Sequence, residues 1–194
     1  MAMWLSGDED ADRLLGESNL ALTIGMVLDQ QVPFERAFSA PYELQQRLGA
    51  KLTAKRLAAM DPDELREVFS RRHALHRFPG SMAERVQRLC QVVVDEWDGK
   101  VERVWETATT GEELYGRLKV LPGFGDYKAR VFVALLAKQL GCRPKGWREA
   151  SEPYGEPGTT MSVADVSSKK TLDAVRAYKR EKRAAAKAAK AAEQ

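Results

Sequence analysis

A five-residue turn near the middle of the chain has the composition needed to hold a phosphate. Leu121-Pro122-Gly123-Phe124-Gly125 joins two stretches with helical patterns, residues 111–120 and 126–140. Pro122 restricts φ and starts a sharp turn, and the two glycines adopt backbone angles that other residues avoid. The N–H groups of the turn and of the first residues of the next helix then point together toward solvent. Such a cluster of N–H groups is typical of a binding site for a phosphate oxygen.

This segment resembles the helix-hairpin-helix of DNA-binding proteins. Its Leu-Pro-Gly-Phe-Gly turn and the long helix after it are similar to those of the HhH-GPD superfamily of base-excision DNA glycosylases. The resemblance extends over residues 20–140, because a capped helix, a basic loop and a further helix in residues 61–89 also fit the family. We expect Leu118, Leu121 and Phe124 to pack the two helices together. Taken alone, the turn is also compatible with an ordinary connection between antiparallel helices.

A pair of glutamines follows an apolar stretch that predicts a buried helix. Residues 19–31 read NLALTIGMVLDQQ, and Ser18 is a suitable N-cap. In the family that the chain resembles, a glutamine at this place enters the duplex and fills the gap left by an extruded base. An amide suits that role because it is flat, neutral and able to hydrogen-bond to the orphan base. The match makes Gln31 the filler and Gln30 its neighbour, and a solvated helix end is the alternative.

The resemblance also assigns chemistry to the start of the long helix. Tyr127 lies two residues after Gly125, where lyases of the superfamily carry a lysine that attacks the sugar and forms a Schiff base. A tyrosine there implies base removal without strand cleavage. Lys128 lies about 100° further round the helix, so we expect it to contact a DNA phosphate rather than act as a lyase. Arg130 is expected to add a similar contact.

The family's second catalytic residue is an aspartate after the long helix, whose carboxylate stabilises the positive charge of the sugar in the transition state. Residues 142–150, where relatives carry it, contain no aspartate, and Glu149 is their only acid. The next aspartate is Asp165, which has an apolar residue before it and a helical pattern after it. We therefore expect Asp165 to face C1′ of the sugar, across a cleft from Tyr127. Glu149 as the acid, Asp165 as a helix cap, and a lineage without the acid remain open.

Other side chains give weaker signals. His73 and His76 lie in the basic segment RRHALHRF, and we expect them at the surface or facing phosphate rather than in a metal site. Trp147 and Tyr154 fall in a stretch rich in proline and glycine, where an aromatic ring could stack on an extruded base. The remaining tryptophans are expected in the core: Trp4, Trp97 and Trp105.

Helices must position these residues, because helix signals are dense and strand signals are nearly absent. Residues suited to cap helices precede many of the apolar patterns, namely Ser18, Thr53, Asp61, Ser81 and Thr110. Pro41 is expected in the first turn of a short helix that ends at Leu48. The patterns predict an all-α protein of two helical lobes, with a DNA-binding cleft between them and the hairpin at its mouth.

The expected domain spans residues 1–178. One lobe is expected to hold residues 30–135, and the other residues 1–29 and 136–178. Residues 179–194 form a tail rich in lysine and alanine, which we expect to be flexible although its residues favour helix.

Composition and charge limit the classes of function. Of the 194 residues, 44% are hydrophobic and 30% are charged, as in ordinary globular domains. No apolar run approaches the ~18 residues of a membrane helix, and the acidic N-terminus lacks a signal-peptide pattern. We therefore expect a cytoplasmic, nucleoid-associated protein. The net charge is only +3, but residues 169–194 hold nine basic and three acidic residues, which indicates an anionic partner.

The two cysteines, Cys90 and Cys142, exclude a four-cysteine iron–sulfur site by count. We expect no metal and no other cofactor.

The sequence thus predicts a monofunctional DNA glycosylase of base-excision repair, which removes a damaged or mispaired base from duplex DNA and acts as a monomer. The expected catalytic residues are Tyr127 and Asp165. The expected DNA-binding residues are Gln30, Gln31, Leu121, Pro122, Gly123, Phe124, Gly125, Lys128 and Arg130. One alternative is a non-catalytic helix-hairpin-helix DNA-binding protein that has lost the acid. Another is an all-α interaction module, which requires the hairpin glycines to be buried against protein.

Overall fold

The computed structural model describes the backbone of residues 3–192 and the side chains of residues 3–189. The described chain is all-helical, and its sole β-type pairing is an isolated bridge between Thr110 and Lys145. The first helices are α1 (Glu9–Glu17), α2 (Asn19–Leu28), α3 (Phe34–Leu48), α4 (Ala54–Ala59), α5 (Pro62–Ser70) and α6 (Pro79–Trp97). They are followed by α7 (Arg103–Glu106), α8 (Gly111–Lys119), α9 (Asp126–Gln139), α10 (Trp147–Ala150), the 3-10 turn η1 (Val163–Asp165) and α11 (Lys169–Ala192). The predicted all-α fold is confirmed.

Local signals account for several helix starts. The side chains of Ser18, Thr53, Asp61 and Thr110 each accept a backbone N–H from the first turn that follows, which satisfies donors that a helix leaves free. Ser81 does not act as the expected cap, because α6 already begins at Pro79.

Two helices differ from the expected boundaries. α3 is continuous from Phe34, with Pro41 in its interior rather than in its first turn. Proline removes one hydrogen bond there, but Pro41 is buried among the apolar residues of α3, and this packing keeps the helix intact. α11 continues as helix to Ala192, so residue 178 is not a structural boundary, as the high helix propensity of alanine and lysine allows.

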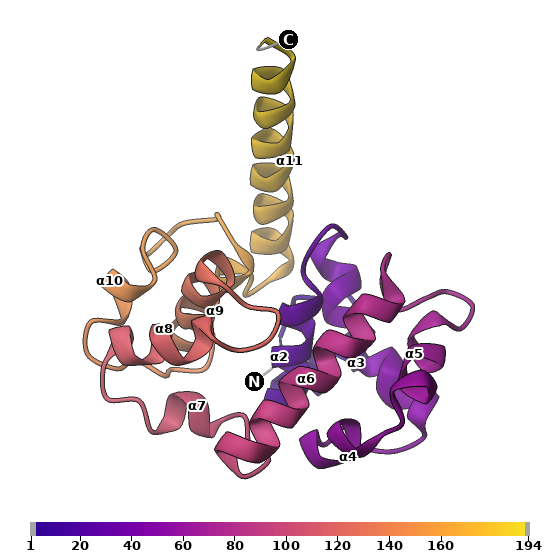
Figure 1. Ribbon diagram of the computed structural model, residues 1–194. Helices are drawn as coiled ribbons and strands as arrows, with labels where there is room; N and C mark the ends of the chain where they lie inside the picture. The colour runs from indigo at the N-terminus through magenta and orange to yellow at the C-terminus, as the bar shows by residue number, and fades with distance from the viewer. Residues whose placement is uncertain (1–2, 193–194) are drawn as a thin grey trace.

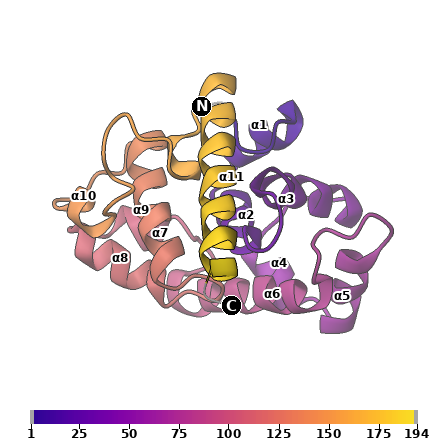
Figure 2. The ribbon, with the colours of Figure 1, turned by 90° about the horizontal axis from the view of Figure 1, so that it is seen from above.

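The helices group into two lobes (Figures 1 and 2). α1 to α6 contact one another on one side, while α7 to α10 and η1 pack around α9 on the other. This grouping differs from the expected lobes: α1 and α2 join the first lobe, and the hairpin helices α8 and α9 join the second. The physical reason is burial of α2, whose residues from Leu20 to Leu28 are all buried, with α3 as its main neighbour.

The long helix α11 rises from the body beside the junction of the lobes (Figure 1). Its first turns bury Leu172 and Val175, whereas its side chains from Arg180 to Ala189 are exposed. Among the described helices, none is both long and apolar enough to cross a membrane.

Candidate functional site

The hairpin between α8 and α9 has the expected packing. Leu118 and Leu121 are buried, and the ring of Phe124 lies edge-to-face on Phe132 with 5.5 Å between centroids. Gly123 and Gly125 have positive φ, 88° and 107°. The turn is thus held by apolar contacts from below, and α9 begins directly after it.

The two hairpin glycines have different surroundings. A Cβ atom at Gly123 would lie 2.8 Å from Val27 Cγ1 and 2.9 Å from Arg85 Cδ, whereas one at Gly125 would meet nothing within 4 Å. Gly123 therefore allows the turn to approach α2 and α6 closely, and Gly125 leaves the start of α9 open. This open backbone argues against an interaction module in which both glycines are buried against protein.

A small cavity lies beside the hairpin, and its lining holds more basic than acidic side chains. It measures about 290 Å³ and is lined by Pro122 and Gly123 of the turn and by Ser81, Glu84, Arg85 and Arg88 of α6, where Arg88 pairs with Glu84. No local pattern in the sequence marks these two arginines, because only the fold brings the middle of α6 against the turn. A guanidinium group beside the turn favours a phosphate at this place.

The two glutamines after α2 behave differently. The Gln30 amide donates to Val27 O at 3.0 Å and accepts from Arg85 Nη1 at 3.0 Å, so its side chain is held in place. Gln31 is exposed and has a positive φ of 56°, which turns the chain sharply at this point. Gln31 is therefore the less constrained of the two glutamines, and its role in DNA stays a prediction.

His76 supports this turn from within the protein. Its Nδ1 accepts the Phe78 N–H at 3.0 Å, so its Nε2 carries the proton and donates to Gln30 O at 2.9 Å. The imidazole is 3% exposed, and burial lowers its pKa. The expectation that His76 lies at the surface is wrong, because its ring holds the backbone at Gln30, while His73 is exposed.

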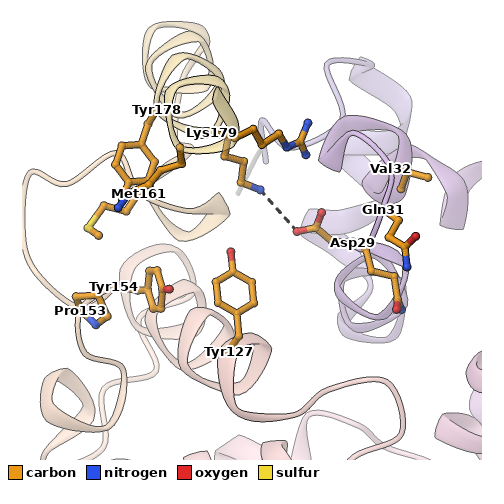
Figure 3. Close-up of a pocket in the computed structure, with 12 residues that line it drawn as sticks. Asp29, Gln31, Val32, Tyr127, Pro153, Tyr154, Met161, Tyr178 and Lys179 are labelled. Carbon is orange, nitrogen blue, oxygen red and sulfur yellow. Dashed lines mark ion pairs between the residues drawn. The ribbon is translucent and has the colours of Figure 1, made fainter. Parts of the chain in front are cut away.

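A larger pocket lies between the end of α2, the start of α9 and α11 (Figure 3). Its volume is about 540 Å³, and its lining residues are Asp29, Gln30, Gln31, Val32, Tyr127, Pro153, Tyr154, Met161, Tyr178, Lys179, Lys182 and Arg183. Tyr127 is half-exposed, and its ring lies edge-to-face against Tyr154 at 5.6 Å. Burial, followed by the nearby Asp29 charge, raises the pKa of Tyr127 to about 12, so its hydroxyl stays protonated at neutral pH.

Asp29 is the acid in this pocket among the described residues. Its side chain is 11% exposed, and Oδ2 lies 3.8 Å from Lys179 Nζ. Figure 3 shows the Asp29 carboxylate and the Tyr127 hydroxyl pointing toward the same space. Burial raises the pKa of Asp29, while the positive charges of Lys179 and Lys128 act against that rise. No sequence signal pointed to Asp29, because a carboxylate after a helix is usually solvated.

Lys128 does not reach the surface. It is 8% exposed, and its Nζ donates to Val27 O at 2.6 Å. Burial lowers the pKa of this ammonium to about 8. The expected phosphate contact of Lys128 is therefore corrected: α9 turns this side chain toward the end of α2, where it neutralises helix carbonyls and lies near Asp29. Arg130 is partly exposed, pairs with Asp126 and covers the Tyr115 ring.

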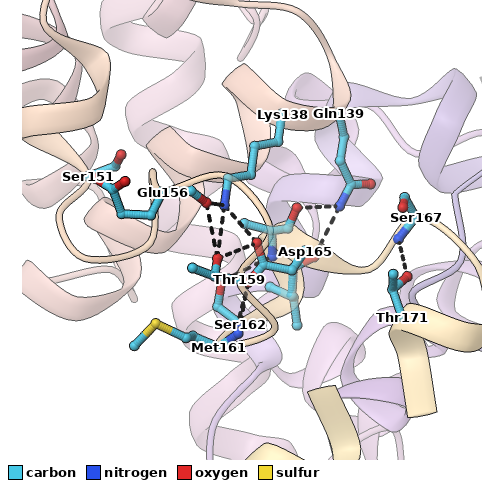
Figure 4. A network of polar contacts seen from close by, with 12 residues as sticks. Lys138, Gln139, Ser151, Glu156, Thr159, Met161, Ser162, Asp165, Ser167 and Thr171 are labelled. Carbon is cyan, nitrogen blue, oxygen red and sulfur yellow. Dashed lines mark hydrogen bonds and ion pairs between the residues drawn. The ribbon is translucent and has the colours of Figure 1, made fainter. Parts of the chain in front are cut away.

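Asp165 does not face Tyr127. Its Oδ1 accepts from Lys138 Nζ at 2.7 Å and from Thr159 Oγ1 at 3.0 Å, and its Oδ2 accepts the N–H groups of Met161 and Ser162 (Figure 4). The side chain is 3% exposed. The expected position across the cleft is corrected, because Asp165 completes a capping box with Ser162 at the start of η1.

The aromatic residues that were expected near an extruded base or in the core lie in different environments. Trp147 is 8% exposed, because it begins α10 and packs into the core, so it is not available to stack on a base. Tyr154 lines the pocket. Trp105 is buried and Trp97 is half-buried, but Trp4 is 43% exposed, which corrects the expectation that it belongs to the core.

Among the described residues, no group of three or more His, Cys, Asp or Glu side chains is arranged to hold a metal. Cys90 is buried and Cys142 is half-buried.

The comparison with known protein families agrees with the identification of the helix-hairpin-helix. The model of the HhH-GPD superfamily of base excision DNA repair proteins matches residues 24–194. Neither the comparison with curated proteins nor that with solved structures gave a match. The family match spans most of the chain and includes the turn at Gln30 and Gln31, the hairpin and α11. The chain therefore belongs to the HhH-GPD superfamily of base excision DNA repair proteins.

Proposed function

We propose that this protein is a monofunctional DNA glycosylase, which hydrolyses the N-glycosidic bond of a damaged or mispaired base in duplex DNA. The observation that carries the proposal is the pocket itself, which opens beside the hairpin and brings Tyr127 and the exposed Gln31 to one cavity. At about 540 Å³ it falls in the range of small-ligand sites, roughly 300–1,000 Å³, which suits one extruded nucleoside.

Different parts of the protein surface are suited to different contacts with DNA. The hairpin N–H groups with Arg85 and Arg88 suit a phosphate of the duplex, and the exposed cations of α11 add contacts that do not depend on sequence. Gln31 fills the place of the extruded base, while Gln30 and His76 hold the backbone from which it projects. Aromatic faces of Tyr127 and Tyr154 are suited to contact the extruded base.

Absence of lyase chemistry is part of the proposal. Tyr127 replaces the amine that would attack the sugar, and the neighbouring amine of Lys128 is buried and bonded to Val27 O. We therefore expect hydrolysis by water, with no Schiff base and no cofactor. The protein is expected to act as a monomer on the DNA of the nucleoid.

The test is the formation of abasic sites. Duplexes that carry uracil, thymine opposite guanine, 8-oxoguanine, ethenoadenine or an alkylated purine are incubated with the purified protein and read with and without alkali. We expect strand cleavage only after alkali, and no covalent complex with an abasic duplex in the presence of borohydride. Cleavage without alkali together with borohydride trapping would contradict the monofunctional assignment.

A second candidate is a non-catalytic DNA-binding protein of the same family. The observation that favours it is the engagement of Asp165, the aspartate that stands after the hairpin helix, by four hydrogen bonds. This candidate predicts salt-sensitive duplex binding with no abasic sites on any substrate.

A further inference from the structure

Asp29 and Asp165 are both shielded from solvent, but their partners differ. Asp165 accepts four hydrogen bonds. The Asp29 side chain accepts none from the described residues, and its nearest cation is Lys179 Nζ at 3.8 Å. Its oxygens open into the pocket that Asp29 lines, so they are accessible to a group that enters it.

The position of Asp29 in α2 also disfavours the ionised form of its side chain. It is the C-cap of α2, where the partial negative charge of the helix end disfavours a carboxylate. The chain nevertheless holds it rigidly, because the Asp29 N–H donates to Gly25 O at 3.0 Å and the next residue is fixed by His76. An acid kept in an unfavourable but well-defined place inside a cleft is typical of a functional site.

Burial raises the pKa of Asp29, and two nearby cations oppose that rise. Lys179 of α11 stands on one side, with its Nζ 4.5 Å from the centre of the Phe34 ring, and Lys128 of α9 stands on another. These cations come from two elements remote in sequence, and both favour the ionised form of Asp29. Neither cation forms a hydrogen bond with a carboxylate oxygen of Asp29. The carboxylate is therefore free to act on a group that enters the pocket.

We infer that Asp29 is the catalytic carboxylate of this protein, placed at the end of α2 instead of after the hairpin helix. The inference rests on the proposed function, because it assigns a role in glycosidic bond hydrolysis. Lys179 and Lys128 are positioning residues, which act through the charge of Asp29. Asp165 is then a structural residue of the second lobe.

The reaction balances with water as the co-reactant. The C1′–N bond breaks and its electron pair leaves with the base, so positive charge develops on C1′ and the ring oxygen of the sugar. The Asp29 carboxylate stabilises that charge in a site from which most water is excluded. A water oxygen then bonds to C1′, one of its protons passes to Asp29 and on to solvent, and the departing base takes a proton from solvent.

The test measures recognition of the transition-state charge and does not depend on which base is removed. One duplex carries a pyrrolidine abasic-site analogue, whose ring nitrogen is protonated, and a matched duplex carries the neutral tetrahydrofuran analogue. Binding of the full-length protein to each is measured by fluorescence anisotropy. We expect the wild type to bind the cationic duplex at least about 100-fold more tightly, which is the lower end for transition-state analogues.

Three variants identify the responsible acid. Asp29→Asn should abolish the preference for the cationic duplex while it still binds the neutral one. Asp98→Asn is the matched control, since Asp98 is an exposed C-cap with positive φ that asparagine tolerates. Asp165→Asn should keep the preference if it remains folded, as judged by circular dichroism.

The outcomes separate the inference from the proposed function. A preference retained in Asp29→Asn, or lost only in Asp165→Asn, overturns the role of Asp29. A wild type with no preference overturns it as well. Abasic sites formed by Asp29→Asn at the wild-type rate would also overturn it, yet leave the glycosylase proposal standing. The glycosylase proposal fails on different evidence, namely no abasic sites from the wild type.

Discussion

At the scale of single residues, two aspartates show how partners decide a role. Asp165 is 3% exposed and fully bonded, and Asp29 is 11% exposed with no donor among the described residues. Removing a charge from the first breaks a network, whereas removing it from the second relieves a desolvated group. Asp165→Asn is expected to lower stability and to keep the preference for the cationic duplex. Asp29→Asn is expected to keep stability and to lose that preference.

The first prediction concerns the stability of these two variants. Asp165→Asn should lower the free energy of unfolding by about 2–4 kcal/mol, because Lys138 is left partly buried without its partner. Asp29→Asn should be at least as stable as the wild type, since burial disfavours the charge that it removes. Urea denaturation followed by circular dichroism measures both. A large loss of stability in Asp29→Asn alone would contradict the structural contrast.

The second prediction concerns pH. Burial raises the pKa of Asp29, so its carboxylate is neutralised on acidification earlier than an ordinary aspartate. The charged or titratable groups that face Asp29 are Lys179, Lys128, Glu35, Arg183 and Tyr127. The preference for the cationic duplex should therefore fall as the pH drops through the raised pKa of Asp29. A preference that stays constant until the protein unfolds would exclude Asp29 as its source.

At the scale of elements, the hairpin combines rigidity with an open backbone. Its apolar residues pack α8 on α9, while Gly123 lets the turn approach Val27 of α2 and Arg85 of α6. This approach links the hairpin turn to the turn at Gln30 and Gln31, because Val27 O also accepts from the Gln30 amide and from Lys128. Distortion at Gly123 should therefore reach the pocket.

The third prediction uses two glycines of the same hairpin. Gly123→Ala should lower the free energy of unfolding by about 1–3 kcal/mol, because it combines a positive φ of 88° with a Cβ atom 2.8 Å from Val27. Gly116→Ala is the matched control, and it should raise stability by about 0.5–1 kcal/mol because this exposed helical site has open space. Thermal denaturation distinguishes the two. Equal effects would contradict the close approach at Gly123.

At the scale of the whole molecule, the site is built where three distant segments meet. Asp29 comes from the first lobe, Tyr127 from the second, and Lys179 from α11, which projects beyond the body (Figure 1). Cations on the exposed part of α11 continue from the pocket rim along the helix, since Lys182 and Arg183 line the pocket and Lys187 follows them. The molecule therefore presents positive charge where duplex DNA would lie.

The fourth prediction concerns the salt dependence of DNA binding. Replacing Lys182 and Arg183 together by alanine should weaken binding equally for all sequences and reduce the salt slope by about 2, one unit for each lost phosphate contact. The control replaces Lys51 and Lys55, which are exposed near α4, at the opposite end from α11 (Figure 1). Anisotropy titrations at several salt concentrations measure the slope. An equal loss in the control would mean that net charge, and not α11, determines binding.

The helices, most of the predicted caps and the hairpin turn could be predicted from the amino-acid sequence. These features depend on residues that act through their own backbone and their nearest neighbours, namely Ser18, Thr110, Pro122 and Gly125. Such effects depend on the local sequence alone. It also determined the place of Gln31 and Tyr127, because both lie at fixed distances from recognisable turns. Short-range chemistry is sufficient for these features.

Which charged residues are buried, and where they point, depends on packing between segments that are distant in sequence. Lys128 and His76 were expected at the surface, and each is held by a carbonyl at the end of α2 or just after it. The choice between Asp29 and Asp165 depends on contacts with residues far away in sequence, Lys179 for one and Lys138 for the other. Burial and electrostatic environment are properties of packed segments, so no local pattern contains them.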